Sequence, residues 1–152
     1  MSKVFLGLGS NLGNKEENIN IAIRKIEEQV GNVLACSPFF YSKPQGFVSK
    51  NDFVNTAICC QTNLTPRQVL LITQNIERQL GRTKKTRKGF PYSDRTIDID
   101  ILLFDDLHIN EPDLTIPHPK MQERDFVMIP LKQIRAQNLF DDFGILDGKH
   151  HV

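Results

Sequence analysis

Two aspartates, Asp98 and Asp100, stand two residues apart in an apolar, β-branched segment that spans residues 95–104. Such a segment predicts a strand. Because side chains alternate along a strand, both carboxylates would project from one face. The opposite face would carry Ile97, Ile99, Ile101 and Leu103. The two aspartate Cα atoms would lie about 6–7 Å apart, which suits two divalent cations separated by about 3.5–4 Å. We favour metal binding over solvated or lysine-paired aspartates, because partly buried like charges without a counter-ion are costly.

A strongly basic segment precedes this strand. Residues 82–95 lack hydrophobic periodicity and carry one acid, Asp94, against six basic side chains: Arg82, Lys84, Lys85, Arg87, Lys88 and Arg95. Beside metal-binding carboxylates, this composition suits a polyphosphate, since cations bridge phosphate oxygens and arginines take up charge that develops during transfer. The alternative is a solvated charged loop, the commonest fate of such segments.

Three weaker features accompany these two. Gln74 and Glu77 lie three residues apart on one flank of a predicted helix and could contact a polar ligand or face solvent. His118 stands in a proline-bounded loop, where a lone histidine is more often structural than catalytic. The sequence offers no Ser/His/Asp or Cys/His set for covalent catalysis, but phosphoryl-type transfer requires only positioning and charge neutralisation.

A second class of function is an RNA-binding module. The segment Lys88-Gly89-Phe90 begins like an RNA-binding consensus that places aromatic side chains on a central strand. Pro91 interrupts that pattern, and the residues after it do not continue it. RNA binding through the basic segment therefore stays the alternative.

The composition is that of one globular domain, which we place at residues 1–152. Apolar residues make up 39% and charged residues 24% of the chain, and the net charge of +1 gives no overall electrostatic case for nucleic acid. The three cysteines, Cys36, Cys59 and Cys60, have no disulfide or metal-knuckle spacing. No signal peptide or transmembrane-length segment is evident. We expect a cytoplasmic protein with reduced thiols and no membrane or nucleic-acid partner.

The order of predicted elements is β-α-β-β-α-β. The strands are expected at residues 4–8, 33–41, 53–62 and 95–104, with a helix capped by Asn14 after the first. A second helix should begin at Thr65-Pro66 and end at Gly81. After the last strand we expect a short extended piece at 107–109, turns at 110–120 and a partly helical segment at 126–134. This order predicts an α+β, ferredoxin-like fold: an antiparallel sheet with helices packed on it.

Several ordered motifs together resemble the 6-hydroxymethyl-7,8-dihydropterin pyrophosphokinase family of folate biosynthesis. The resemblance extends from Val4 to about Ile134. It rests on Gly9-Ser10-Asn11-Leu12, Phe53-Val54-Asn55-Thr56-Ala57, Gln74-Asn75-Ile76-Glu77, Gly81-Arg82, the aspartate strand, Ile116-Pro117-His118-Pro119 and the segment from Met121 to Phe126.

The resemblance implies transfer of pyrophosphate from ATP to the pterin hydroxymethyl group, with release of AMP. Two Mg²⁺ ions would be held by Asp98 and Asp100, and Arg82 and Arg95 would be the transition-state arginines. The implied ATP contacts are Gln74, Glu77, Arg82, Lys84, Arg95, Ile101, Thr115, His118 and Arg124. The implied pterin contacts are Ser42, Pro44, Gln45, Phe53, Asn55, Asp98 and Phe126. ATP and a reduced pterin would be the partners of a monomer, or at most of a weak homodimer.

Some positions depart from the family pattern. Phe53 stands where a tyrosine is often found, and Ser93-Asp94 stand where the family usually has Gly-Pro. The chain has no tryptophan, which leaves Phe90 and Tyr92 as candidates for the aromatic ring that covers the adenosine. Asp113 occupies the place of a basic ATP contact found in some members.

Overall fold

An antiparallel sheet of five strands forms the centre of the molecule. The computed structural model describes residues 1–43, 52–81 and 96–135. The strands are β1 (Ser2–Ser10), β2 (Gly31–Cys36), β3 (Phe40–Ser42), β4 (Phe53–Thr62) and β5 (Asp98–Phe104). Their order is β2-β4-β1-β5, with β3 paired to β4 beyond the end of β2, and every pair is antiparallel. This order confirms the predicted ferredoxin-like arrangement.

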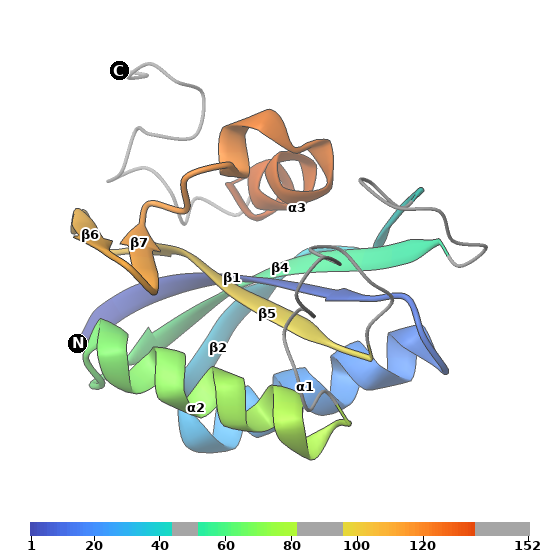
Figure 1. Ribbon diagram of the computed structural model, residues 1–152, viewed down its shortest axis with the longest axis horizontal. Helices are drawn as coiled ribbons and strands as arrows, with labels where there is room; N and C mark the ends of the chain where they lie inside the picture. The colour runs from blue at the N-terminus through green and yellow to red at the C-terminus, as the bar shows by residue number, and fades with distance from the viewer. Residues whose placement is uncertain (44–51, 82–95, 136–152) are drawn as a thin grey trace.

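Helices cover both faces of the sheet. Figure 1 shows α1 (Lys15–Gln29) and α2 (Pro66–Gln79) below the sheet and α3 (Asp125–Arg135) above it. The predicted helix starts are confirmed. Asn14 caps α1 by accepting from the Glu17 N–H, and Thr65 caps α2 with Pro66 at its first position. α2 stops before Gly81, whose φ of 106° suits a residue without a side chain.

Two hydrophobic cores lie on opposite sides of the sheet. The larger core packs α1 and α2 against inward-facing residues such as Leu6, Ile58 and Ile99. The smaller core packs α3 against the other face. The adjacent Cys59 and Cys60 fall in different cores, as the alternation along a strand requires. Among the residues that the structure describes, no helix combines the length and hydropathy that crossing a bilayer requires.

The strand predicted for residues 33–41 is in fact two strands. β2 ends at Cys36 and β3 begins at Phe40. Ser37 continues the pairing with β4 for one residue, since its N–H donates to the Ala57 carbonyl at 2.9 Å and its hydroxyl lies 2.9 Å from the Thr56 hydroxyl. Pro38 then has no N–H to offer a neighbouring strand, so the ladder breaks.

A small hairpin occupies the segment that we had assigned to turns. β6 (Ile109–Glu111) pairs with β7 (Leu114–Ile116), and a short 3₁₀ helix, η1 (Met121–Glu123), precedes α3. The segment 110–120, predicted to be rich in turns, does contain turns at 112–113 and 119–120, but the pairing of β6 with β7 was not predicted. The predicted helical segment near the C-terminus is confirmed as α3.

The face assigned to one residue of the aspartate strand was also wrong. Ile97, Ile99 and Ile101 belong to the core beneath α1 and α2, but Leu103 belongs to the core beneath α3. The register between β1 and β5 shifts there, because Phe5 pairs with Leu103 and Leu6 with Ile101. The additional residue is a β-bulge, which reverses the alternation beyond it.

Candidate active site

Asp98 and Asp100 project from the sheet face that α3 covers. Asp98 pairs with Gly9 and Asp100 with Gly7 across the β1–β5 ladder. Gly7 shares its face with Phe5, which belongs to the α3-side core. Both aspartates are half-buried, and the predicted placement on one face is confirmed.

A row of three residues across the sheet brings Asn55 towards Asp98. Gly9 pairs with Asn55 on β4 and with Asp98 on β5, so the two side chains flank it on the same face. With two strand spacings between them, the Asn55 and Asp98 Cα atoms lie about 10 Å apart. The Asn55 amide lies close against Gly9: a Cβ added to Gly9 would lie 2.6 Å from Asn55 Oδ1, so the absence of a side chain on Gly9 is what admits the amide.

The Asn55 side chain is buried and incompletely bonded. Asn55 is only 8% exposed. Within the described part of the chain, its Nδ2 is the one buried side-chain nitrogen or oxygen without a hydrogen-bond partner. A buried amide donor without an acceptor is costly. The arrangement is therefore suited to a ligand that brings an acceptor to this atom.

Two aromatic residues lie on the same side of the sheet. Phe53 is two residues before Asn55 on β4 and so shares its face, and it pairs with Ser42 of β3. Phe126, in the first turn of α3, packs on the α3-side core. The Arg124 guanidinium carbon lies 5.5 Å from the centre of the Phe126 ring, a cation–π contact. Apart from the buried Asn55, the members of this group are half-buried: Ser42, Phe53, Arg124 and Phe126.

The outer edge of β5 is contacted by two residues predicted to bind ATP. The Ile99 N–H donates to Glu77 Oε2 at 2.8 Å, and Glu77 is only 2% exposed. Further along the edge, the His118 N–H donates to the Leu102 carbonyl at 2.9 Å. Because the Ile101 side chain is 6% exposed and packs in the core, a ligand at this edge would meet chiefly its backbone.

Gln74 and Thr115 belong to the two elements that reach this edge. Gln74 precedes Glu77 by three residues on α2, and Thr115 lies in β7 between two residues that pack in the core, Leu114 and Ile116. Gln74 and Thr115 are half-buried. The remaining predicted site residues lie outside the described residues: Pro44, Gln45, Arg82, Lys84, Phe90, Tyr92 and Arg95.

Comparison with known proteins identifies the family. A sequence model described as 7,8-dihydro-6-hydroxymethylpterin-pyrophosphokinase (HPPK) matches residues 5–136 of the chain. The chain belongs to the HPPK family.

Individual HPPK relatives match most of the chain. It is 43% identical over 135 residues to the 2-amino-4-hydroxy-6-hydroxymethyldihydropteridine pyrophosphokinase of Porphyromonas gingivalis, covering 88% of this chain and 91% of that protein. It is also 40% identical over 132 residues to a folic acid synthesis protein of Dictyostelium discoideum, covering 86% of this chain but 19% of that one. Neither relative is named for RNA binding, so the comparisons give no support to that alternative.

A solved structure with the same fold is the HPPK-DHPS of Plasmodium falciparum, wild type with SDX-DHP. The TM-score is 0.70 at 16% sequence identity, and the match covers 88% of this chain. The chain spans about 40% of the length of that protein. At this identity the match supports the fold alone.

The carboxylates of Asp98 and Asp100 suit a Mg²⁺ ion whose other ligands come from water and a bound phosphate. Asp98 and Asp100 supply two carboxylates, and among residues 1–43, 52–81 and 96–135 no group of three or more His, Cys, Asp or Glu side chains is placed to hold a metal. Mg²⁺ characteristically takes one or two carboxylates and fills its other positions with water and substrate phosphates. Two aspartates on one strand face therefore suit metal-bound ATP better than a metal enclosed by protein ligands.

Two features of the HPPK site were not predicted from the sequence. The sequence contains the Gly9-Ser10-Asn11 motif, but the place of Gly9 between Asn55 and Asp98, with the Asn55 amide close against it, depends on strand register. Asp113, at the position where the resemblance led us to expect a basic ATP contact in some members, pairs with Arg67, and its Oδ2 lies 2.7 Å from a guanidinium nitrogen. No sequence signal joined these two residues, which are 46 positions apart.

Proposed function

We propose that this chain transfers the terminal pyrophosphoryl group of ATP to the hydroxyl of 6-hydroxymethyl-7,8-dihydropterin and releases AMP, as a step of folate biosynthesis. The observation that carries the proposal is the row Asn55–Gly9–Asp98. It places a buried, unpartnered amide donor beside a half-buried carboxylate pair on one face of the sheet. HPPK family membership, over residues 5–136, supplies the reaction.

The pterin would bind between the Asn55 amide and Asp98. Phe53 and Phe126 lie on that side of the sheet and supply aromatic faces for a flat heterocycle. The Asn55 amide would donate to an acceptor on the edge of the ring, which removes the cost of leaving that donor buried without a partner. Ser42, opposite Phe53, and the undescribed Pro44 and Gln45 would complete this side of the pocket.

ATP would lie along the outer edge of β5. Glu77 of α2 contacts this edge, and Gln74 precedes it by one helical turn. His118 contacts the edge from the loop that follows β7, the strand that carries Thr115. Asp98 is the member of the carboxylate pair that shares a row with Asn55, so it stands where the two substrates would meet. Arg124 would bring a positive charge from the α3 side.

Asp98 and Asp100 would hold the Mg²⁺ ions of MgATP, which neutralise phosphate charge when bound. The chain's own contribution is to orient the pterin hydroxyl oxygen towards the β-phosphorus. A bond forms between those two atoms, the bond from the β-phosphorus to the oxygen retained by AMP breaks, and the hydroxyl proton is released. Arg82 and Arg95 would stabilise charge that develops on the phosphate oxygens. We also propose that the chain acts as a monomer in the cytoplasm, where ATP is available.

The direct test is product analysis with ATP, Mg²⁺ and 6-hydroxymethyl-7,8-dihydropterin. We expect one AMP and one pterin pyrophosphate per turnover. A dihydropterin with a methyl group in place of the hydroxymethyl group is the matched control and should give no AMP, because it lacks the attacking oxygen. Formation of ADP, or AMP release that is indifferent to the pterin, would contradict the proposal.

A further inference from the structure

The two elements that approach the edge of β5 are also joined to each other away from it. α2 contacts the edge through Glu77, and the segment after the hairpin contacts it through His118. A third connection runs from Arg67, at the beginning of α2, to the tip of the β6–β7 hairpin. Together the three connections link α2, β5 and the β6–β7 hairpin in a closed series of contacts, and these segments carry the residues assigned to ATP.

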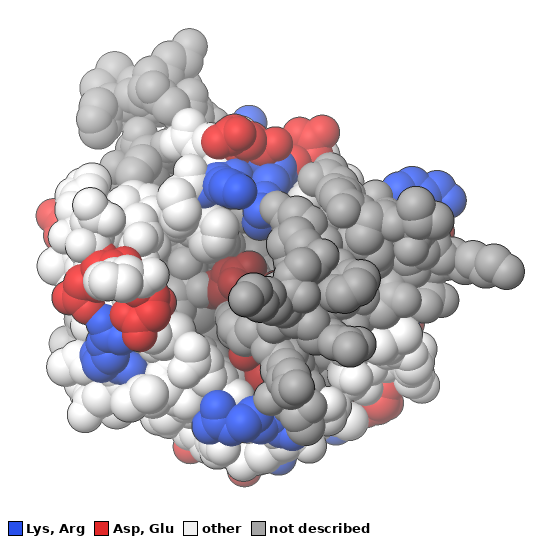
Figure 2. All heavy atoms as spheres, in the orientation of Figure 1, with Lys and Arg blue, Asp and Glu red and all other residues white. Residues whose placement is uncertain are grey.

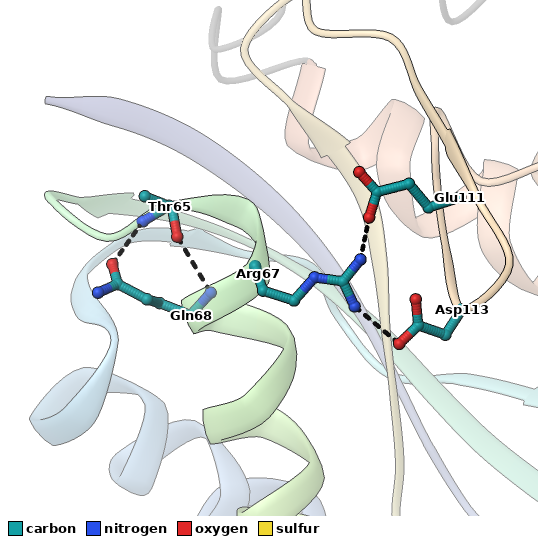
Figure 3. A network of polar contacts seen from close by, with 5 residues as sticks. All are labelled: Thr65, Arg67, Gln68, Glu111 and Asp113. Atoms are coloured by element: carbon teal, nitrogen blue, oxygen red, sulfur yellow. Dashed lines mark hydrogen bonds and ion pairs between the residues drawn. The ribbon is translucent and has the colours of Figure 1, made fainter.

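Arg67 binds two carboxylates of the hairpin at once. One guanidinium nitrogen lies 2.7 Å from Asp113 Oδ2, and the other contacts Glu111 Oε1 (Figure 3). The backbone that carries Arg67 is fixed by a capping box. The Gln68 N–H donates to the Thr65 hydroxyl at 3.2 Å, and the Thr65 N–H donates to Gln68 Oε1 at 2.9 Å. The guanidinium therefore extends from a well-defined helix start.

The two carboxylates that bind Arg67 lie near the N-terminus of α2, where negative charge is favourable. The first turn of α2 contains no acidic residue. Glu111 and Asp113 bring negative charge to this terminus, where the helix dipole favours it, and offset the positive charge of Arg67. The hydrogen bond with Arg67 lowers the pKa of the Asp113 carboxyl, and the bonds with Asp113 and Glu111 raise the pKa of Arg67. Asp113 and Arg67 therefore stay charged around neutral pH.

The hairpin depends on such anchoring. Each strand has three residues, and an isolated two-stranded hairpin is at best marginally stable. Leu114 and Ile116 pack its β7 strand into the core beneath α1 and α2. Its tip is exposed and is held against α2 by Arg67. Thr115 lies two residues after Asp113 of the tip, between the core residues Leu114 and Ile116, and the chain continues from there to His118.

We propose that Arg67 is a positioning residue for the nucleotide. Its paired contacts hold the hairpin tip against α2 and so fix Thr115 and His118 relative to Gln74 and Glu77. This inference rests on the proposed function, because it takes those four residues as the ATP side of the site. Arg67 itself touches no reacting atom. Its loss should weaken nucleotide binding and leave the chemical step and the pterin side unchanged.

The test compares Arg67→Met with the wild type. We expect KM for MgATP to rise about 3- to 10-fold, a modest factor because the contacts are partly exposed. The kcat at saturating MgATP and KM for the pterin should stay within twofold. Amide hydrogen exchange across residues 109–116 should accelerate. Arg67→Lys should be intermediate, because an ammonium cannot reproduce the two-pronged contact of a guanidinium.

The carboxylate partners allow an independent check. Glu111→Gln combined with Asp113→Asn should raise KM for MgATP to the same extent, and adding Arg67→Met should have no additional effect. Arg24→Met is the matched control, since Arg24 makes an exposed ion pair with Glu17 on α1, at 3.4 Å, away from the hairpin. If the wild type releases AMP but Arg67→Met has an unchanged KM for MgATP, the positioning role is overturned. An equal rise in KM for MgATP and for the pterin would overturn it as well. Failure of the wild type to release AMP would instead remove the proposed function and this inference together.

Discussion

Gly9→Ala is expected to damage the pterin side of the site selectively. A Cβ on residue 9 would lie 2.6 Å from Asn55 Oδ1 and 3.8 Å from the Val54 carbonyl oxygen. Ordinary contact begins at 3.4 Å, so the Asn55 amide must retreat by about 0.8 Å. The new methyl group would also fill part of the space between Asn55 and Asp98 where the pterin is proposed to bind.

The size of the effect follows from the hydrogen bond that is displaced. Useful N–H···O distances cover only about 0.5 Å, from 2.7 to 3.2 Å, so a shift of about 0.8 Å moves the rigid amide out of range. A buried donor left without its partner costs about 1–3 kcal/mol, which is about a 5- to 150-fold loss of pterin affinity. Stability should change little, because alanine is preferred to glycine in strands by about 0.5–1 kcal/mol and offsets the local displacement.

Calorimetric titration with a non-reactive pterin analogue, and separately with an ATP analogue and Mg²⁺, measures both sides of the site. Gly7→Ala is the matched control. Gly7 lies on the same strand and face, but the three atoms nearest to its added Cβ all belong to the Leu102 side chain, the closest at an ordinary 3.4 Å. The reasoning is refuted if Gly9→Ala binds the pterin normally, if the ATP analogue loses as much affinity, or if Gly7→Ala behaves the same way.

Three other outcomes are expected. Phe126→Ala should weaken binding of the pterin analogue by about 1–3 kcal/mol, the usual scale of ring stacking. Binding of the ATP analogue should weaken less. If calorimetry gives an unchanged affinity for the pterin analogue, Phe126 does not stack on the pterin. Asp98→Asn and Asp100→Asn should each abolish the part of ATP-analogue binding that depends on Mg²⁺, which titrations with and without the ion would reveal. Burial raises the pKa of Cys59 to about 11 and of Cys60 to about 12, from 9.0. The two thiols therefore lose their protons at a lower pH in the unfolded chain than in the folded chain. Their contribution to the free energy of unfolding is complete below pH 9 and falls between about pH 9 and 12. Urea unfolding at pH 8 and pH 10.5 should show this fall, and replacing Cys60 with alanine should reduce it.

The distribution of surface charge bears on the alternative function, RNA binding. On the face seen in Figure 2, the Lys and Arg side chains drawn in blue form separate groups, some of them beside Asp and Glu side chains, and do not form one continuous basic area. The Arg67 group is an example of such pairing. Nucleic-acid surfaces usually gather one sign of charge. The described part of this face therefore gives RNA binding no support, and the basic segment 82–95 on which that alternative rests lies outside the described residues.

Short-range patterns in the sequence were enough to predict the main elements. Asn14 and Thr65-Pro66 determine where two helices begin, because caps act within one turn. The alternation around Asp98 and Asp100 predicts that both carboxylates share a face, because a strand repeats every two residues. The order of these elements limits the topology to a ferredoxin-like sheet, and the motifs along the chain identify the family.

The tertiary structure alone decided how distant residues meet. The row of Asn55, Gly9 and Asp98 depends on the register of three strands, which is set by packing between segments far apart in the chain. The bulge that moves Leu103 to the other face arises from pairing with β1, not from its own sequence. Arg67 meets Glu111 and Asp113 across more than forty residues. Local propensity carries no information about such contacts, because they exist only once the sheet and its helices have packed.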